Sequence, residues 1–185
     1  MAKQFESINA RLKDFIGRQH IFFTASATVS SRVNISPRET GCLRLIDANS
    51  VVYLDRTGSG NETAAHLRAD GRLTMMFCAV AGPPMILRLY GRGRAIHRDS
   101  SEYESILASH YDGLEPSGAR QIIWLDIDLV QTSCGFGVPL FDYKAERTSL
   151  DQWTEAKGPG GLEIYRREKN TYSMDGLPSG MFDEH

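Results

Sequence analysis

Short apolar runs separated by turn-forming residues recur along the chain, and this pattern constrains the fold more than any other feature. The runs that predict strands cover residues 20–26, 31–36, 42–46, 51–54, 73–80, 85–97 and 121–130. A polar link at residues 47–50 joins two of these runs in the way typical of a hairpin. Many short strands with few crossover helices favour an antiparallel barrel over a doubly wound parallel sheet. We therefore predict a mainly β (α+β) fold with a few peripheral helices.

Helical periodicity appears first near the N-terminus. The spacing of five apolar residues predicts a helix that ends near Gly17, namely Phe5, Ile8, Leu12, Phe15 and Ile16. Further helices are expected up to Leu67 and over residues 99–113.

The chain after the last predicted strand has a different texture. Residues 131–143 are rich in glycine and aromatic residues without a regular period, and long irregular segments of this kind are often functional. A short helix over residues 150–156 should be broken at residues 158–161, which read Gly-Pro-Gly-Gly. The polar stretch from Asn170 onward should wrap the surface or be loosely held.

Two predicted strands carry polar faces. In the run that Pro37 should break, alternation separates polar from apolar side chains: Arg32, Asn34 and Ser36 against Val33 and Ile35. In the run over residues 85–97, one face carries three arginines, Arg88, Arg92 and Arg94. Each polar face is compatible with solvent exposure or with an anionic ligand, and the arginine face also with a polar subunit contact. Gly91 and Gly93 indicate a bend or bulge, whereas residues 73–80 lack alternation and should be buried on both faces.

The stretch from Asp55 to Arg68 joins a strand to a helix through a loop of small residues. Unpaired N–H groups at such a helix start can form an anion site. Ser59 and Glu62 also match a capping box, which needs no ligand, and the spacing by itself favours this second interpretation. The loop is neither a dinucleotide-binding fingerprint nor a Walker loop, because the third glycine and the Gly-Lys-Ser/Thr run are missing.

Composition limits the classes of function. The chain has 185 residues, 41% of them apolar and 24% charged, with a net charge of -2, so nothing attracts it as a whole to nucleic acid or to acidic membranes. Three distant cysteines suggest neither a disulfide framework nor a zinc site. No apolar run reaches membrane-spanning length and no signal-peptide core is evident, so we expect a cytoplasmic protein.

No catalytic acid, base or metal site can be assigned from the residues. Asp126 and Asp128 share one strand face without a nearby histidine, which favours an exposed face over a metal site. His66 and His110 lie alone on predicted helices, and lone histidines are more often structural than catalytic.

Four segments keep the order seen in one superfamily: residues 31–38, 53–63, 67–77 and 84–93. Together they resemble the pyridoxamine 5'-phosphate oxidase-like, FMN-binding split-barrel family, in particular an uncharacterised branch of it. The resemblance covers about residues 5–145. It implies an antiparallel split β-barrel over residues 1–148, which would bind FMN at the interface of a homodimer, and a C-terminal helix and tail over residues 149–185 packed on the barrel.

The resemblance also implies a set of cofactor-binding residues. The strand matching residues 31–36 would lie along the ring and ribityl chain of FMN, and the loop would meet the phosphate: Arg32, Val33, Asn34 and Ser36, then Thr57, Gly58, Ser59, Gly60, Asn61 and Thr63. Arg88 would lie near the cofactor or across the dimer, and residues 133–143 would close over the flavin from the other subunit. Where the family carries a Ser-Arg-Lys run, this chain has Gly60-Asn61-Glu62-Thr63. Positive charge would then come from elsewhere, with Arg32, Arg68, Arg88 and Lys144 as the candidates.

The function that this resemblance implies is an FMN-dependent oxidoreductase with an unassigned small-molecule substrate and NAD(P)H as a candidate electron donor. The alternative is a binding or sensing module that holds a flavin, a deazaflavin or haem without a reaction of its own. Neither a nucleic acid nor a membrane is expected as a partner.

Overall fold

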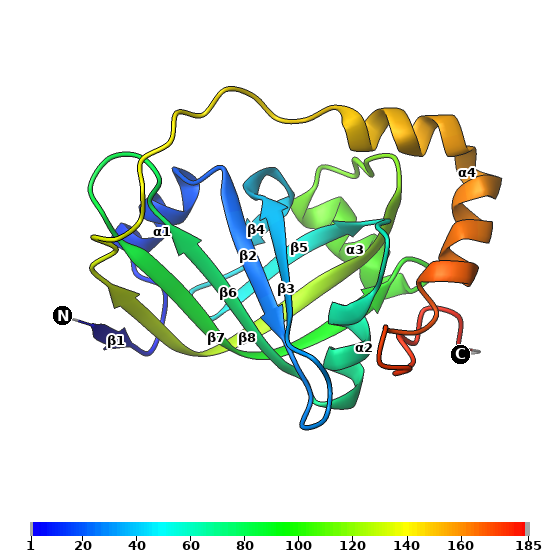
Figure 1. Ribbon diagram of the computed structural model, residues 1–185, viewed down its shortest axis with the longest axis horizontal. Coiled ribbons are helices and arrows are strands. Elements are labelled where there is room, and N and C mark those ends of the chain that lie inside the picture. The colour runs from blue at the N-terminus through cyan, green and yellow to red at the C-terminus, as the bar shows by residue number, and fades with distance from the viewer. Residues whose placement is uncertain (1, 184–185) are drawn as a thin grey trace.

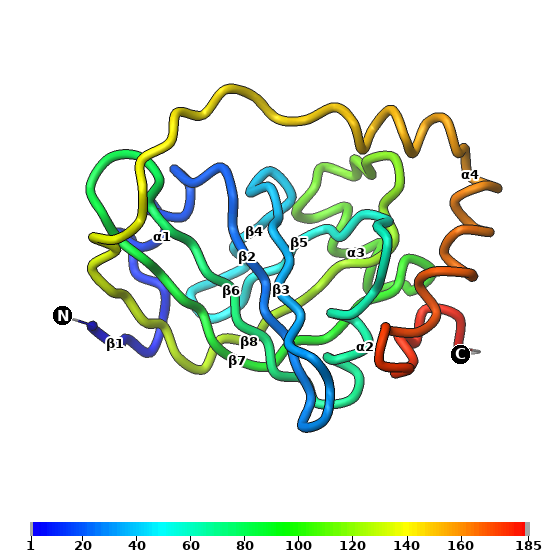
Figure 2. Tube along the Cα trace, viewed as in Figure 1, coloured from blue at the N-terminus to red at the C-terminus, as the bar shows by residue number. Residues whose placement is uncertain are grey.

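Antiparallel strands, curled into a half-barrel, form the body of the protein in this computed structural model, which describes residues 2–183 (Figures 1 and 2). The strands are β1 (Lys3–Phe5), β2 (Ile21–Ser26), β3 (Asn34–Glu39), β4 (Leu43–Leu45), β5 (Ser50–Arg56), β6 (Arg72–Cys78), β7 (Ile86–His97) and β8 (Ala119–Ser133). Within the described residues they make one eight-stranded sheet in the order β3-β2-β6-β7-β8-β5-β4, and β1 also pairs with β8. The predicted antiparallel split-barrel fold is confirmed.

The helices lie around this sheet. They are α1 (Ala10–Gly17), α2 (Glu62–Ala69), α3 (Ser101–His110) and α4 (Ser149–Lys169), with a single 3-10 turn at Thr40–Cys42. Within residues 2–183, none of them combines the length and the apolar character needed to cross a bilayer. Met1 and residues 184–185, the end of the predicted tail, lie outside the described residues.

The core fills the inner side of the curled sheet. Phe22 lies at its centre, with its ring 5.6 Å from that of Tyr53 and 5.4 Å from that of Phe77. A second apolar cluster, which includes Leu54, Ile96 and Tyr103, packs α3 against β5, β7 and β8.

Two expectations about the first third of the chain are wrong. The first helix does not include Phe5, which lies in β1 and pairs with Val130. Asn9 caps the helix instead, because its side chain accepts a hydrogen bond from the Leu12 N–H. Pro37 does not break its strand but pairs with Phe23 inside β3. It is tolerated there because β3 is an edge strand, where a missing N–H costs no ladder hydrogen bond.

The prediction that residues 73–80 are buried on both faces is also wrong. In β6, Leu73, Met75 and Phe77 are buried, whereas the alternate residues are half-exposed. The sheet forms a single curled layer, so its outer side faces away from the core.

The predicted break in the C-terminal helix is confirmed at Gly158, whose φ of 62° is not helical and divides α4 into two segments. The second segment, which runs on to Lys169, is not predicted from the sequence pattern. Pro159 fits because a proline in the first turn of a helical segment lacks only an N–H that has no intrahelical partner anyway. Before α4, residues 134–148 form no helix or strand and arch over the sheet (Figure 1). We call this segment the strap.

A buried carboxylate ties three strands together at one end of the barrel. Asp55 in β5 is 1% exposed, and its Oδ2 accepts hydrogen bonds from Arg120 Nε and Gln121 Nε2 in β8, both at 2.8 Å. Its Oδ1 forms an ion pair with Arg38 Nη1 of β3, also at 2.8 Å. Burial alone would raise the pKa of Asp55, but the charges of Arg120 and then Arg38 outweigh it and hold that pKa below its usual value.

Replacing Gly91 with Ala should destabilise the fold. The predicted bulge is confirmed, because the register of β7 and β8 shifts between Tyr90 and Gly91. A Cβ on Gly91 would lie 1.9 Å from the Asp126 carbonyl oxygen, so the strands would have to separate. We expect a loss of about 3 kcal/mol in the free energy of unfolding, measured with urea. Gly17→Ala is the control, since no atom lies within 4 Å of its added Cβ, and an equal loss in both variants would contradict the close approach.

Replacing Asp55 with Asn should cost about 3–5 kcal/mol at pH 7, because it leaves Arg38 and Arg120 without their buried counter-charge. The pKa of Asp55 is lower in the folded state than in the unfolded state, where it is about 3.9. The ionised carboxylate therefore stabilises the fold fully above about pH 3.9, and this stabilisation is lost as the pH falls through the lower pKa of the folded state. Urea denaturation should therefore show a gap between wild type and variant that is constant from pH 7 to pH 5 and shrinks below pH 4. Asp128→Asn, on the exposed face of β8, should change stability by less than about 0.5 kcal/mol.

Candidate functional site

Three of the predicted site residues meet where the edge strand β3 passes the start of α2. Asn34 Nδ2 donates a hydrogen bond to Thr63 Oγ1 at 3.1 Å, and Ser36 Oγ donates to Asn34 Oδ1 at 3.3 Å. Strand alternation produces this corner, because Asn34 and Ser36 point inward and are half-buried. Val33 and Ile35 on the opposite face are 68% and 65% exposed. We call this place the β3–α2 corner.

A histidine that the sequence gives no reason to place at a site lies beside this corner. Ser26 is the cross-strand neighbour of Asn34, and its Oγ lies 3.1 Å from His66 Nδ1. His66 is 1% exposed, and its Nε2 has no hydrogen-bond partner among the described residues. Its position three residues after Thr63 on α2 is the one signal that could have placed it here.

The start of α2 is not closed by a capping box, so that interpretation is wrong. Asn61 occupies the cap position, and no side-chain cap hydrogen bond is present in this part of the described structure. Glu62 Oε2 instead accepts a hydrogen bond from the Met174 N–H at 3.0 Å. The first-turn N–H groups of α2 are thus left without a side-chain acceptor, which is favourable for an anion.

The loop before α2 is held by residues from distant parts of the chain. Thr57 is 1% exposed and accepts a hydrogen bond from Arg166 Nε at 2.8 Å. The carbonyl oxygen of Gly58 accepts from Asn170 Nδ2 at 3.0 Å, and that of Gly60 accepts from Arg120 Nη1 at 2.8 Å.

Asn170 is the centre of this arrangement, although it begins the stretch that the sequence predicts to wrap the surface or to be loosely held. It is fully buried, and its Oδ1 accepts a second hydrogen bond of Arg120 at 2.8 Å. Its carbonyl oxygen accepts from Asn61 Nδ2 at 3.3 Å and from Ser179 Oγ at 2.6 Å. The C-terminal segment therefore fixes the loop from behind. Ser59, the remaining predicted loop residue, is exposed.

Arg32 precedes β3 and contacts the C-terminal tail. Its N–H donates a hydrogen bond to Asp175 Oδ2 at 2.8 Å, and its guanidinium forms an ion pair with the same carboxylate. The hydrogen bond from the Arg32 N–H, helped by the guanidinium charge, lowers the pKa of Asp175.

Arg88 lies away from the corner within one chain. It sits in β7 and donates a hydrogen bond to Ser133 Oγ at 3.3 Å. Cross-strand partners lie on the same face of a sheet, and the partners of Arg88 on the successive strands are Met76, Phe23 and Pro37. Pro37 lies on the face of β3 opposite to Asn34 and Ser36, so Arg88 lies on that opposite face as well. Of the other two predicted arginines, Arg92 binds the Asp70 carbonyl and Arg94 pairs with Glu102.

A largely apolar groove of about 730 Å³ runs under the strap, beside the far end of β3. Tyr143 of the strap stacks on His20, with ring centroids 3.7 Å apart, and Phe23 and Phe141 also line the groove. Burial raises the pKa of Cys42 in this groove to about 12, so its thiol stays protonated. The groove has the size and lining typical of small-molecule sites.

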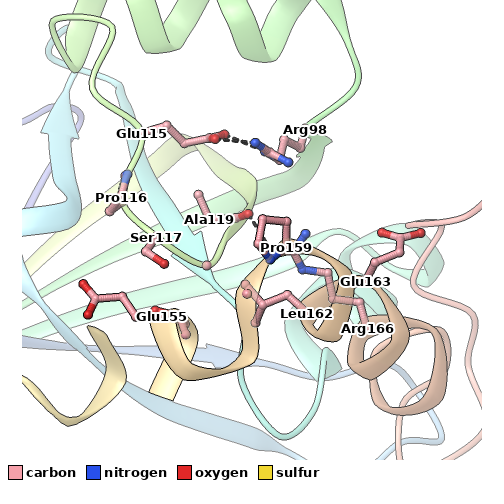
Figure 3. Close-up of a pocket in the computed structure, with 13 residues that line it drawn as sticks. Arg98, Glu115, Pro116, Ser117, Ala119, Glu155, Pro159, Leu162, Glu163 and Arg166 are labelled. Atoms are coloured by element: carbon pink, nitrogen blue, oxygen red, sulfur yellow. Dashed lines mark hydrogen bonds and ion pairs between the residues drawn. The ribbon is translucent and has the colours of Figure 1, made fainter. Parts of the chain in front are cut away.

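A second cavity, of about 530 Å³, lies between α4 and the turn before β8 (Figure 3). Arg98 pairs there with Glu115, while Arg166 reaches from α4 and donates to the Ala119 carbonyl at 2.9 Å. Glu155 and Glu163 also line it, so its charges are mixed. Among residues 2–183, no cluster of His, Cys, Asp or Glu is arranged to hold a metal ion.

Comparisons with solved structures support the fold. A structure of a HupZ variant from Group A Streptococcus covers 68% of this chain and 99% of its own, at 15% identity and a TM-score of 0.53. A structure from Lactobacillus delbrueckii covers 68% of this chain and 94% of its own, at 13% identity and a TM-score of 0.53. These two likenesses concern the fold alone.

Sequence comparison identifies the family. The chain is 37% identical over 191 residues to the pyridoxamine 5'-phosphate oxidase family protein ustO of Aspergillus flavus, an alignment that covers 94% of this chain and 76% of that protein. The family model for pyridoxamine 5'-phosphate oxidase matches residues 8–134. The chain therefore belongs to the pyridoxamine 5'-phosphate oxidase family.

Proposed function

We propose that this protein is an FMN-dependent oxidoreductase of the pyridoxamine 5'-phosphate oxidase type that acts on a small-molecule substrate. One observation carries the proposal. Asn34 and Ser36 of β3 converge with Thr63 at the uncapped start of α2, in a chain that belongs to this family. Arg32 lies two residues before Asn34.

The donors at the β3–α2 corner fit a phosphate ester. Arg32 offers a charged guanidinium and a backbone N–H, and Asn34 and Thr63 offer an amide and a hydroxyl. The orphaned Nε2 of buried His66 shows that this region holds an unsatisfied polar group. Glu62, which would repel a phosphate, is turned toward the Met174 N–H.

The chain's own residues would bind and orient the cofactor. Arg32, Asn34, Ser36 and Thr63 would hold the phosphate end of the cofactor. When bound, FMN supplies the redox chemistry, while the protein supplies position, electrostatics and exclusion of water.

A non-catalytic carrier of a flavin, a deazaflavin or haem is the second candidate. It is favoured by the burial of His66, the histidine nearest the corner, which leaves no exposed histidine there among the described residues to transfer a proton.

We further propose that the protein acts as a homodimer. The outer face of edge strand β3 presents Ile35, and Val33 lies just before the strand on the same face; they are 65% and 68% exposed. Exposed apolar side chains that lie side by side are typical of an interaction surface.

Spectroscopy of the purified protein tests the function. An FMN-dependent oxidoreductase should absorb near about 450 nm, as flavins do, and should be bleached anaerobically by NADH or NADPH. A yellow protein that neither reductant bleaches would favour the carrier, and a Soret band would favour haem. Failure to take up added FMN would contradict the flavin proposal.

Arg32→Ala should weaken FMN binding at least about tenfold, because it removes a charged donor to the phosphate. Fluorescence titration of FMN measures the dissociation constant. Arg72→Ala is the matched control, since both arginine side chains are mostly exposed, at 71% and 60%, and both pair with a carboxylate. Arg72 lies beyond the other end of α2, so equal dissociation constants for the two variants would rule out the proposed corner.

Ile35→Lys should shift the protein toward the monomer, because it places a charge on the proposed apolar interface. Light scattering should give twice the 20.6 kDa chain mass for wild type and a lower mass for the variant at micromolar concentration. Val29→Lys, at a residue 96% exposed in the β2–β3 turn, should leave the mass unchanged. A wild-type mass of one chain would contradict the dimer.

A further inference from the structure

We propose that the carboxylate of Asp175 occupies the place of a ligand's phosphate at Arg32, so that the C-terminal tail and a phosphate ester compete for the same donors. Asp175 would thereby lower the affinity of the site for phosphorylated ligands and leave its affinity for unphosphorylated ligands unchanged. The inference rests on the proposed cofactor site, and it assigns that site a competitor within the chain.

The contacts of Asp175 are those expected of a bound phosphate. One oxygen accepts the Arg32 N–H at 2.8 Å and the other pairs with the Arg32 guanidinium. A backbone N–H together with an arginine is a common pair of donors to phosphate oxygens. The Asp175 side chain is 16% exposed and that of Arg32 is 71% exposed, so an incoming anion could reach the arginine.

The surroundings of Asp175 are also those of an anion site. Its neighbour Met174 donates a backbone hydrogen bond to Glu62 in the first turn of α2, which places Asp175 beside the positive end of that helix. Arg32 and the helix start therefore both favour a negative group here.

The structure of the tail would allow the Asp175 carboxylate to move away from Arg32 while the remainder of the tail stays folded. Tyr172 bridges to Pro178, the Ser173 N–H donates to the Leu177 carbonyl at 2.8 Å, and Gly176 takes a positive φ of 80°. Residues 172–178 thus form a small hairpin with Asp175 near its tip.

The base of this hairpin is anchored independently of its tip. Asn170 is fully buried, and Ser179 is 1% exposed and donates to the Asn170 carbonyl. Tyr172 and Met174, nearer the tip, are 61% and 71% exposed. The tip is held by the hydrogen bond from the Met174 N–H to Glu62 and by the contacts of Asp175 with Arg32, whose side chain is 71% exposed. Because the arginine is open to solvent, its ion pair is weak and a phosphate could displace the carboxylate from it.

Titration of FMN and riboflavin into wild type, Asp175→Asn and Asp183→Asn tests the competition. Asp175→Asn should bind FMN about fivefold more tightly than wild type, the size of effect expected when an exposed ion pair no longer competes. Its riboflavin affinity should be unchanged, because riboflavin has no phosphate. Asp183 pairs with Arg68 elsewhere on the tail, so Asp183→Asn should match wild type for both ligands. Equal FMN affinities of wild type and Asp175→Asn would overturn the inference.

Limited proteolysis gives a second readout that does not need a flavin. Chymotrypsin should cut after Tyr172 faster when FMN or inorganic phosphate displaces the hairpin tip from wild type, as followed by mass spectrometry. Phosphate-dependent cleavage without FMN binding would sink the flavin proposal and support the competition. If FMN binds and neither anion changes the cleavage rate, the competition is wrong and the flavin proposal stands. If neither FMN nor phosphate binds to any variant, and neither changes the cleavage rate, then the flavin proposal and the competition are both wrong.

Discussion

The buried charge of Asp55 is the interaction on which the rest of this structure depends. A lone carboxylate in the core would be unfavourable, and it is retained because Arg38 and Arg120 approach it from two other strands. Arg120 comes from β8, which pairs with β5, whereas Arg38 comes from β3, the edge strand at the far end of the sheet order. The two arginines therefore link β5 both to its neighbour and to a strand with which it shares no ladder.

One of the two arginines that pair with Asp55 also contacts the candidate site. Arg120 extends from Asp55 to the Gly60 carbonyl and to Asn170, so the loop before α2 is bound to the core and to the C-terminal segment together. The loop itself carries no basic residue, and its order comes from groups far away in the chain. This makes the tail part of the site and explains how a tail carboxylate comes to lie against Arg32.

The sequence predicts the local features well and the distant ones poorly. Alternation correctly separates Asn34 and Ser36 from Val33 and Ile35, and paired glycines correctly indicate the bulge at Gly91, because both depend on neighbouring residues. The second helical segment of α4 after the break at Gly158 and the inclusion of Pro37 in β3 depend on tertiary context. Nothing local marks Asn170, which is polar and follows a helix, as the buried partner of a loop more than a hundred residues away.

We infer that a phosphate binds between Arg32 and the start of α2, in the place that Asp175 now holds. A crystal structure of the protein grown with FMN would test this inference. We expect phosphate density within hydrogen-bond distance of the Arg32 N–H, Asn34 and Thr63, with the Asp175 carboxylate moved away. Density for the phosphate elsewhere, with Asp175 still bound to Arg32, would contradict it.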